Sequence, residues 1–296
     1  MMKNKIKRSI RRFIGKHNPK LLVSILYRIA YGKWMDWDNP LTLNEKIHWL
    51  KFNTDTTLWT LLADKYRVRE YVKQCGYEEL LVKLYGVWEQ PDDIDWNSLP
   101  EQFVMKSNCS SGDVRICTNK SEININEWTE HFKKAIKEKN GYERGEPHYN
   151  SIKPAIIAEE LLDVQKQSIK TSSLIDFKVW CFNEVPHHIW ACYNRTSKTV
   201  EVAVYDKEWN YHPEKSIFTE HYIESAHRLP RPQSLKKMLE CARALSVGLP
   251  QVRVDFYEVD GKLYFGEMTM TGGSAFMNWY TEDFMLEMGN LIPLTK

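Results

Sequence analysis

Two short runs near the end of the chain predict a β-hairpin with paired carboxylates. Residues 253–257 and 265–269 alternate polar with apolar side chains, and Asp260-Gly261 between them is a typical hairpin turn. Because successive side chains of a strand point to opposite faces, Asp255 and Glu267 are expected on one face. Two carboxylates held side by side suit Mg²⁺, whose remaining positions bind water and phosphate oxygens. The hairpin therefore indicates chemistry on a nucleoside triphosphate.

A second explanation of this hairpin stays open, because exposed hairpins often carry Asp and Glu only as solvated polar faces. Arg253 favours a binding site. It precedes Asp255 by two residues and is expected on the same face, where its guanidinium would neutralise charge that develops on a transferring phosphoryl group. A cation beside two carboxylates is more than a solvated surface requires.

The chain is long enough to bury a large core and to form two or three lobes. It has 296 residues, of which 43% are hydrophobic and 27% are charged, as is typical of a soluble globular protein. No apolar run reaches the roughly 18 residues of a membrane-spanning helix.

Charge is distributed unevenly along the sequence. The first 33 residues contain ten Lys or Arg and no Asp or Glu, although the net charge of the whole chain is only +2. Apolar residues recur at helical spacing in 6–14 and 21–29, and Asn18-Pro19 separates the two stretches, so this head is expected to form two amphipathic helices. It either lies on an anionic membrane surface or packs on the protein with its charges in water. The remaining chain is acidic, which argues against nucleic acid as a partner.

Six cysteines are scattered through the sequence without a Cys-x-x-Cys pair or the spacing of zinc ligands. Several lie in apolar runs, as buried reduced thiols do. We therefore expect a protein of the reducing cytoplasm, and peripheral attachment to the inner face of the cytoplasmic membrane is an open alternative.

The order of predicted elements divides the chain into four parts: a basic helical head (1–40), a helical lobe (41–100), a small α+β lobe (101–165) and a larger strand-rich lobe (166–296). Loop signals at Pro91 and Pro100 mark the second boundary. The patterns predict helices at 43–51, 64–73, 125–139, 233–247 and 282–288, and strands at 103–108, 114–118, 155–161, 174–182, 187–193 and 199–205.

Two further stretches carry residues suited to a nucleotide. Lys106 precedes the small-residue loop 107–112 between two predicted strands, where loop N–H groups and the ammonium group can both reach phosphate oxygens. An ordinary hairpin turn is the more frequent explanation of such a loop. An apolar strand ends at Glu159, Glu160 and Leu161. Its backbone could form hydrogen bonds with an adenine, while one of the glutamates accepts a hydrogen bond from a ribose hydroxyl. Two ordinary surface glutamates explain this pair equally well.

In their order along the chain, these residues resemble the ATP-grasp superfamily. From residue 43 to residue 294 the chain is more closely similar to the TupA-like ATP-grasp proteins of teichuronopeptide and cell-surface polysaccharide synthesis. The stretches that carry the resemblance are DKYRVREYV (64–72), IKPAIIAEE (152–160), DFKVWCFN (176–183), YDKEWN (205–210), VRVDFY (252–257) and YFGEMT (264–269).

The resemblance implies an α+β ATP-grasp fold with a small antiparallel lid lobe, a larger C-terminal antiparallel-sheet lobe and a helical N-terminal region. It implies ATP and Mg²⁺ as cofactors, with the nucleotide clamped between the two lobes. The implied nucleotide-binding residues are Lys65, Lys106, Ser110, Ser111, Gly112, Glu159, Glu160, Leu161 and Lys178. Asp255, Glu267 and Thr269 would ligate the metal, and Arg253 and Lys178 would be the catalytic residues.

The reaction implied by the resemblance is a ligation, because members of the superfamily form an acyl phosphate that an amine attacks. The expected partners are a glycan or glycolipid precursor that bears a carboxylate, and an amino acid or another amine. Arg195 and His188, on predicted strands, are candidates for binding the carboxylate. A glycan kinase, a glycosyltransferase and a non-catalytic binding subunit stay open as alternatives. The sequence departs from the family pattern at Thr269, where most members have Asn, and in the lid loop, which is poorer in glycine.

Overall fold

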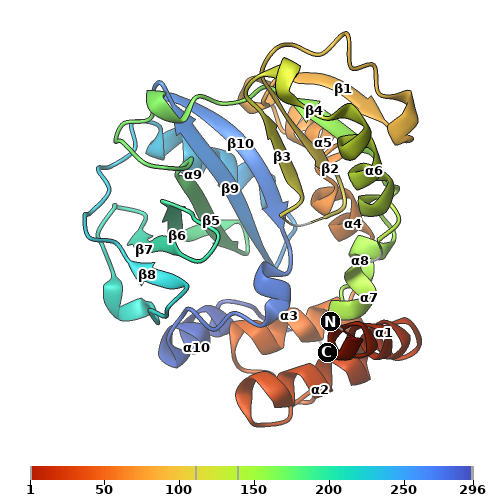
Figure 1. Ribbon diagram of the computed structural model, residues 1–296. Helices are drawn as coiled ribbons and strands as arrows, with labels where there is room; N and C mark the ends of the chain where they lie inside the picture. The colour runs from red at the N-terminus through yellow and green to blue at the C-terminus, as the bar shows by residue number, and fades with distance from the viewer. Residues whose placement is uncertain (1, 111, 139, 295–296) are drawn as a thin grey trace. The chain divides into compact units, whose positions relative to one another are not determined.

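The computed structural model describes residues 2–110, 112–138 and 140–294, without the side chains of residues 2–6 and 140. Figure 1 shows its helices and its two separate sheets. The chain divides into two compact units. Unit 1 contains Met1–Leu22, Thr56–Lys73 and Leu81–Leu162, and unit 2 contains Val23–Asp55, Gln74–Leu80 and Asp163–Lys296. Both units therefore combine segments that are distant in sequence.

Unit 1 is built around a four-stranded antiparallel sheet. Its strands, in their order across the sheet, are β1 (Leu84–Trp88), β4 (Ile156–Glu159), β2 (Phe103–Ser107) and β3 (Val114–Cys117). Its helices are α1 (Met2–His17), α4 (Thr57–Ala63), α5 (Val68–Gln74), α6 (Ile125–Ala135), α7 (Asn140–Arg144) and α8 (Pro147–Asn150), with 3₁₀ turns at Pro91–Asp93 and Lys120–Glu122. Alternate residues of β2 are buried, and Phe103 packs into a core with Trp128 and Phe132 of α6. Asn124 caps the start of α6 by accepting a hydrogen bond from Glu127 N–H.

Unit 2 is built around a six-stranded sheet. Its strands, in their order across the sheet, are β10 (Lys262–Thr269), β9 (Gln251–Val259), β5 (Asp176–Phe182), β6 (Val185–Tyr193), β7 (Val200–Asp206) and β8 (Tyr222–Glu224). Its helices are most of α2 (Pro19–Tyr31), α3 (Leu43–Asn53), α9 (Leu235–Leu245) and α10 (Glu282–Asn290), with 3₁₀ turns at Glu78–Leu80, Val164–Lys166, Pro213–Lys215 and Gly272–Ala275. All neighbouring strands are antiparallel except β7 and β8. Helix α9 covers one face of the sheet, where the Cys181 thiol contacts the Ala242 carbonyl oxygen.

The hairpin of β9 and β10 has the turn that the sequence predicts. Asp260 and Gly261 have φ angles of 55° and 69°, as a type I′ turn requires at its two central positions. A register shift at Gly266 places Glu267 opposite Asp255. A Cβ atom at Gly266 would lie 3.0 Å from the carbonyl oxygen of Asp255, so a glycine fits best at this bulge.

Most elements predicted from the sequence are confirmed, as is the α+β class with antiparallel sheets. The basic head forms two helices that meet at Asn18. The prediction for 125–139 was too long, because α6 ends at Ala135, and the patterns missed α4, α7, α8 and the parallel edge strand β8. These elements are too short to display a clear periodic spacing of apolar residues. The four-part division of the sequence stays a prediction. Within the described ranges, no helix has the length and apolar character to cross a membrane.

Candidate functional site

One face of the unit 2 sheet carries a row of charged side chains on three adjacent strands. Lys178 of β5, Asp255 of β9 and Glu267 of β10 are register partners across these strands. Because every second side chain of a strand shares a face, residues two positions away lie on this face as well. The group, called the sheet cluster below, consists of Asp176, Lys178, Arg253, Asp255, Glu267 and Thr269.

Asp255 lies at the centre of the sheet cluster. It is 1% exposed, and both of its carboxylate oxygens accept hydrogen bonds from cations. Arg253 donates from Nε to Oδ1 and from Nη2 to Oδ2, each at 2.7 Å, and Lys178 Nζ donates to Oδ2 at 2.6 Å. This bidentate arrangement fixes the guanidinium of Arg253 in one orientation.

Glu267 and Thr269 connect to the same guanidinium. Arg253 Nη2 donates to Thr269 Oγ1 at 3.0 Å and to Glu267 Oε1 at 3.4 Å, and Thr269 Oγ1 donates to Glu267 Oε1 at 3.2 Å. The Glu267 side chain is 36% exposed, whereas that of Asp255 is 2% exposed. Glu267 is therefore the carboxylate of this pair that an incoming ligand reaches more easily.

Asp176 adds a third carboxylate, to which the sequence had assigned no role. Its Oδ2 pairs with Lys178 Nζ, and its Oδ1 is buried without a hydrogen-bond partner in the described part of the chain. Burial raises the pKa of Asp176 above its ordinary value. Burial alone would lower the pKa of Lys178, but the Asp176 and Asp255 carboxylates raise it, so Lys178 stays protonated.

The composition of the sheet cluster fits a magnesium ion that arrives with a nucleotide. Its ligand atoms are carboxylate and hydroxyl oxygens, which Mg²⁺ prefers. Three carboxylates stand beside two cations, Lys178 and Arg253, and the unpartnered Asp176 Oδ1 is an oxygen that further positive charge would satisfy. Among residues 2–110, 112–138 and 140–294, no three His, Cys, Asp or Glu side chains form a metal site by themselves. A bound Mg²⁺ would therefore take its other ligands from phosphates and water.

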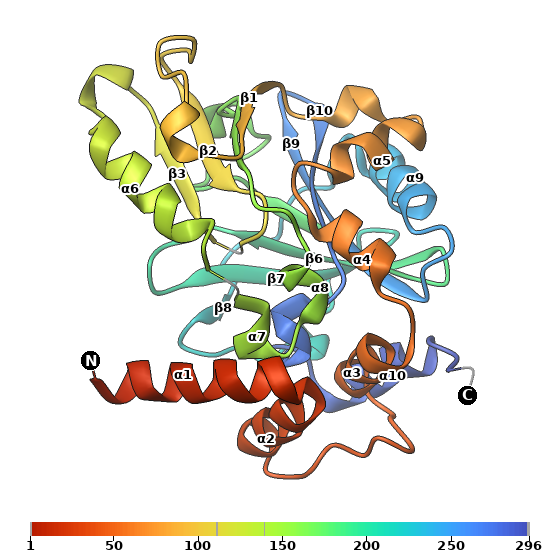
Figure 2. The ribbon, with the colours of Figure 1, turned by 90° about the vertical axis from the view of Figure 1, so that its right-hand side faces the viewer.

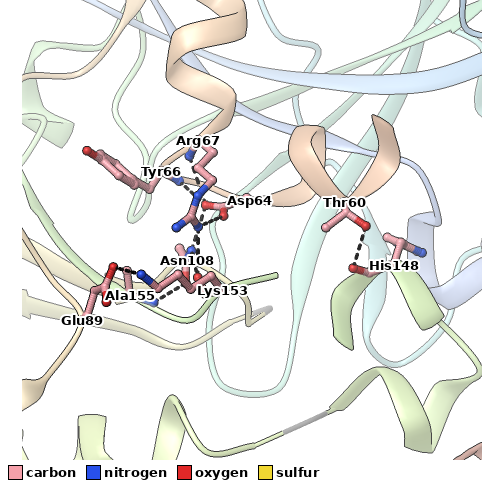
Figure 3. Close-up of polar contacts among 9 residues, drawn as sticks. All are labelled: Thr60, Asp64, Tyr66, Arg67, Glu89, Asn108, His148, Lys153 and Ala155. Atoms are coloured by element: carbon pink, nitrogen blue, oxygen red, sulfur yellow. Dashed lines mark hydrogen bonds and ion pairs between the residues drawn. The ribbon is translucent and has the colours of Figure 1, made fainter. Parts of the chain in front are cut away.

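A separate polar network in unit 1 fixes the start of the predicted lid loop (Figure 3). Asp64 is 1% exposed and accepts hydrogen bonds from Arg67 N–H at 3.1 Å and from Asn108 Nδ2 at 2.8 Å. Asn108 Oδ1 accepts a hydrogen bond from Ala155 N–H at 2.7 Å, and the backbone carbonyl oxygen of Asn108 accepts one from Lys65 N–H at 3.1 Å. The network joins the residue after β2 to the segments that precede α5 and β4.

The lid loop itself is held by Lys65, whose Nζ donates to the Ser110 carbonyl oxygen at 2.8 Å. Gly112 has a φ of 77°, which favours glycine, and Ser111 lies outside the described residues. The structure thus brings Lys65, Ser110 and Gly112 to one loop region, and their contact with phosphates stays a prediction. Sequence reasoning missed Asn108, which only its place directly after a buried strand would have indicated.

Lys106 and Glu159, which the sequence assigned to different parts of a nucleotide, are ion-pair partners. Lys106 Nζ lies 2.5 Å from Glu159 Oε2, and Arg69 Nη1 lies 2.9 Å from Glu159 Oε1. Glu160 is exposed, but its backbone N–H already donates to a carbonyl oxygen beside β1, and Leu161 is half-buried. A phosphate group would have to compete with Glu159 for Lys106.

The two residues expected to bind a carboxylate lie in different environments. His188 is 2% exposed, its Nε2 lies 3.2 Å from the Tyr280 hydroxyl, and its ring packs on Phe284. Burial lowers the pKa of His188 well below its ordinary value, so the ring is neutral. An enclosed, uncharged ring offers a carboxylate no positive charge, and the role of His188 stays a prediction. Arg195 is exposed in the turn after β6 rather than on a strand, and its role stays a prediction.

Comparisons with known proteins give one family and several similar structures. The family model described as TupA-like ATPgrasp matches residues 45–293. No match is found among curated proteins.

Three solved ligases show the extent of the structural likeness. D-Alanine–D-alanine ligase from Bacillus anthracis in complex with ATP has 15% sequence identity and a TM-score of 0.40, over 71% of this chain and 55% of that chain. The D-alanine–D-alanine ligase from Helicobacter pylori has 14% identity and a TM-score of 0.41, over 80% and 60% of the two chains. Phosphoribosylamine–glycine ligase from Thermotoga maritima has 13% identity and a TM-score of 0.41, over 74% and 52%. The chain thus spans little more than half the length of these structures.

Proposed function

Because the chain belongs to the TupA-like ATP-grasp family, we propose that it is an ATP- and Mg²⁺-dependent ligase that joins a carboxylate to an amine. The observation that carries the proposal is the sheet cluster, in which two buried cations and three carboxylates meet on adjacent strands. Such a cluster suits a triphosphate whose negative charge is shared between a divalent metal and protein cations.

The proposed reaction has two steps. In the first, an oxygen of the substrate carboxylate attacks the γ-phosphorus of ATP, the bond from this phosphorus to the β-γ bridging oxygen breaks, and ADP leaves with an acyl phosphate formed. In the second, the amine nitrogen attacks the acyl carbon, the bond from this carbon to the phosphate oxygen breaks, and inorganic phosphate leaves while the amine proton passes to solvent. Neither step needs a nucleophilic side chain.

Residues of the sheet cluster would act by holding charge in place. Arg253 and Lys178 are buried cations, so their attraction for phosphoryl oxygens is weakened little by water. Asp255 keeps both cations oriented through the hydrogen bonds described above. Asp255, Glu267 and Thr269 would hold Mg²⁺, which when bound supplies positive charge for the phosphoryl oxygens.

Residues of unit 1 would bind the nucleotide rather than take part in the chemistry. Lys106 offers an ammonium group, and the loop that Lys65 holds offers backbone N–H groups around Ser110 and Gly112. The present partner of Lys106, Glu159, makes this binding a competition between two anions. We expect these residues to govern the affinity for ATP.

The substrate class belongs to the proposal as well. We expect a glycan or glycolipid precursor that bears a carboxylate, and an amino acid or another amine, because the resemblance of the sequence is to proteins of cell-surface polysaccharide synthesis. We place the reaction at the inner face of the cytoplasmic membrane.

Product analysis tests the proposed function. The full chain is incubated with ATP, Mg²⁺, uronic-acid oligosaccharides and a mixture of amino acids. The proposal predicts ADP, inorganic phosphate and a new amide in equal amounts. ADP with a phosphorylated oligosaccharide would instead indicate a kinase, and product that forms only from a nucleotide sugar would indicate a glycosyltransferase.

A matched pair of variants assigns the activity to the sheet cluster. Glu267→Gln should stop the release of ADP, whereas Glu220→Gln, at an exposed position of unit 2, should leave it unchanged. Equal activity of the two variants would contradict the proposed site.

A further inference from the structure

Helix α1 contacts the rest of unit 1 through a polar face. Arg8 and Arg12 form ion pairs with Glu143 of α7 at 2.6 Å and 2.5 Å. Gly15 lies so close to α7 that a Cβ atom there would be 1.8 Å from the Tyr142 carbonyl oxygen. Figure 2 shows α1 beside α7. Charged and small side chains thus occupy the face where an amphipathic helix normally places its apolar residues.

Two apolar side chains of α1 point to the opposite side. Successive residues of an α-helix are about 100° apart around the axis, so Ile10 and Phe13 lie away from Arg8, Arg12 and Gly15. Their exposed fractions are 54% and 67%. Together these two side chains form the apolar stripe of α1. Because exposed apolar surface is unfavourable in water, an outward stripe of this kind indicates an interaction surface.

Basic residues flank the apolar stripe on both sides. Lys7 and Arg11 lie along one edge and Lys16 lies along the other, and all three are exposed. The first acidic residue of the chain is Asp36. Apolar residues with basic residues at their edges and no acidic residues are typical of helices that lie among the headgroups of an anionic bilayer.

Helix α2, considered by itself, divides its side chains in the same way. Val23 and Tyr27 are buried in a small core of unit 2, whereas Leu21 and Ile29 are 47% and 69% exposed. Arg28 is exposed next to Ile29. The exposed apolar residues of the basic head are therefore not confined to one helix.

We propose that α1 and α2 each bind the surface of an anionic lipid bilayer. Ile10 and Phe13 of α1, and Leu21 and Ile29 of α2, insert among the headgroups, and the basic residues beside them contact lipid phosphates. Charge complementarity favours this partner, since the head contains no carboxylate to pair with the cations of a second copy of itself. Nucleic acid would satisfy the cations but would leave the apolar residues in water. The inference rests on the membrane location in the proposed function, and it requires neither ATP nor substrate.

Co-sedimentation of the full chain with lipid vesicles tests this proposal. Vesicles of phosphatidylcholine and phosphatidylglycerol in equal amounts should bind the chain, and vesicles of phosphatidylcholine alone should bind it much more weakly. The double variant Ile10→Ser, Phe13→Ser should weaken binding to the anionic vesicles by about tenfold or more. The double variant Lys7→Gln, Arg11→Gln should weaken it by about thirtyfold.

Matched variants at other exposed positions control for loss of apolar area and of charge. Ile116→Ser with Val247→Ser removes apolar residues that are 58% and 55% exposed, and Lys170→Gln with Lys236→Gln removes two exposed charges. Both control variants should bind like the intact chain. Circular dichroism establishes that every variant is folded.

Three results would overturn the proposal. The first two are equal binding of the intact chain to both kinds of vesicle and undiminished binding of the Ile10→Ser, Phe13→Ser variant to anionic vesicles. The third is a dimer of the intact chain that this variant abolishes, because it would assign the apolar stripe to contact with a second copy. The vesicle assay contains no ATP and the ligase assay contains no lipid bilayer, so failure of one proposal is distinguishable from failure of the other.

Discussion

The sheet cluster of unit 2 and the polar residues around the lid loop of unit 1 both contain buried charge, but they satisfy it in different ways. The second group, called the lid-loop network below, consists of Asp64, Lys65, Arg67, Asn108 and the ion pair of Lys106 with Glu159. In the sheet cluster, charged side chains of adjacent strands face one another, and strand register sets their distances. In the lid-loop network, the Asp64 carboxylate accepts backbone and amide N–H groups around a turn and forms one ion pair, with Arg67, only three residues further along the chain. The two lysines of unit 1 that were assigned to phosphates, Lys65 and Lys106, are both bound to protein oxygens.

This difference suggests separate roles for the two regions. The sheet cluster has one carboxylate more than it has cations, so a divalent metal can complete it. In the lid-loop network, a phosphate group must displace a protein oxygen from Lys106 before it gains a full ion pair. We therefore expect the sheet cluster to govern the rate of the chemical step and the lid-loop network to govern nucleotide affinity.

The largest expected effect is on stability and concerns Asp255. Asp255→Asn removes the charge that two buried cations share, so it should lower the free energy of unfolding by about 3–5 kcal/mol. Glu267→Gln should lower it by about 1 kcal/mol or less, because this side chain is more than one third exposed. Denaturant unfolding of both variants measures the difference. Equal losses would mean that Asp255 is not the centre of the cluster.

The next effect separates the roles of the two regions in catalysis. Glu267→Gln should lower kcat for ATP turnover at least about a hundredfold, because it weakens charge stabilisation in the transition state. Lys106→Met should instead raise KM for ATP by about tenfold and change kcat less. Steady-state kinetics with varied ATP measures both. The proposed division fails if Lys106→Met lowers kcat as much as Glu267→Gln does.

A smaller effect tests the lid-loop network. Asn108→Ala leaves the buried Ala155 N–H without its hydrogen-bond partner and removes one of the hydrogen bonds to Asp64, so it should cost about 1–3 kcal/mol of stability. Asn119→Ala, in an exposed cap, is the matched control and should cost less than about 1 kcal/mol. Thermal unfolding compares the two, and increased proteolysis of the loop that follows β2 is expected only for Asn108→Ala. Similar stability of the two variants would show that the network does not fix the loop.

The smallest effect is a pH dependence of unit 2. Burial lowers the pKa of His48 and of His188 well below the ordinary value of 6.5. Below pH 6.5 these histidines bind protons in the unfolded chain but not in the folded chain. The stability that the two buried neutral rings contribute is therefore fully present above pH 6.5 and is lost as the pH falls. Each histidine should contribute about 1.4 kcal/mol per pH unit below this value. The slope of unfolding free energy against pH should be smaller for His188→Gln, and an unchanged slope would contradict the buried neutral ring.

Local sequence patterns predicted the hairpin and its two carboxylates, but not the irregularity that brings them together. The Asp260-Gly261 turn by itself pairs Asp255 with Gly266, and the register shift at Gly266 is what places Glu267 opposite Asp255. Asp176 was not assigned, because its place beside Lys178 and Asp255 depends on the pairing of β5 with β9, which are distant in sequence. The ion pair of Lys106 with Glu159 was missed for the same reason.

The environment of His188 could not be predicted from its own strand. Strand alternation indicates which residues share a face, but not which later segment covers that face. Here the covering side chains are Tyr280 and Phe284, nearly one hundred residues further along the chain. The short strand β8 was missed because three residues, Tyr222–Glu224, are too few to display alternation.

Calorimetric titration of the full chain with a non-hydrolysable ATP analogue, with and without Mg²⁺, tests the central claim most directly. We expect Mg²⁺ to tighten binding of the analogue to the intact chain, and we expect Glu267→Gln to remove this gain while the variant stays folded. Binding that is absent, or that is equally strong without Mg²⁺, would contradict a metal-assisted nucleotide site at the sheet cluster.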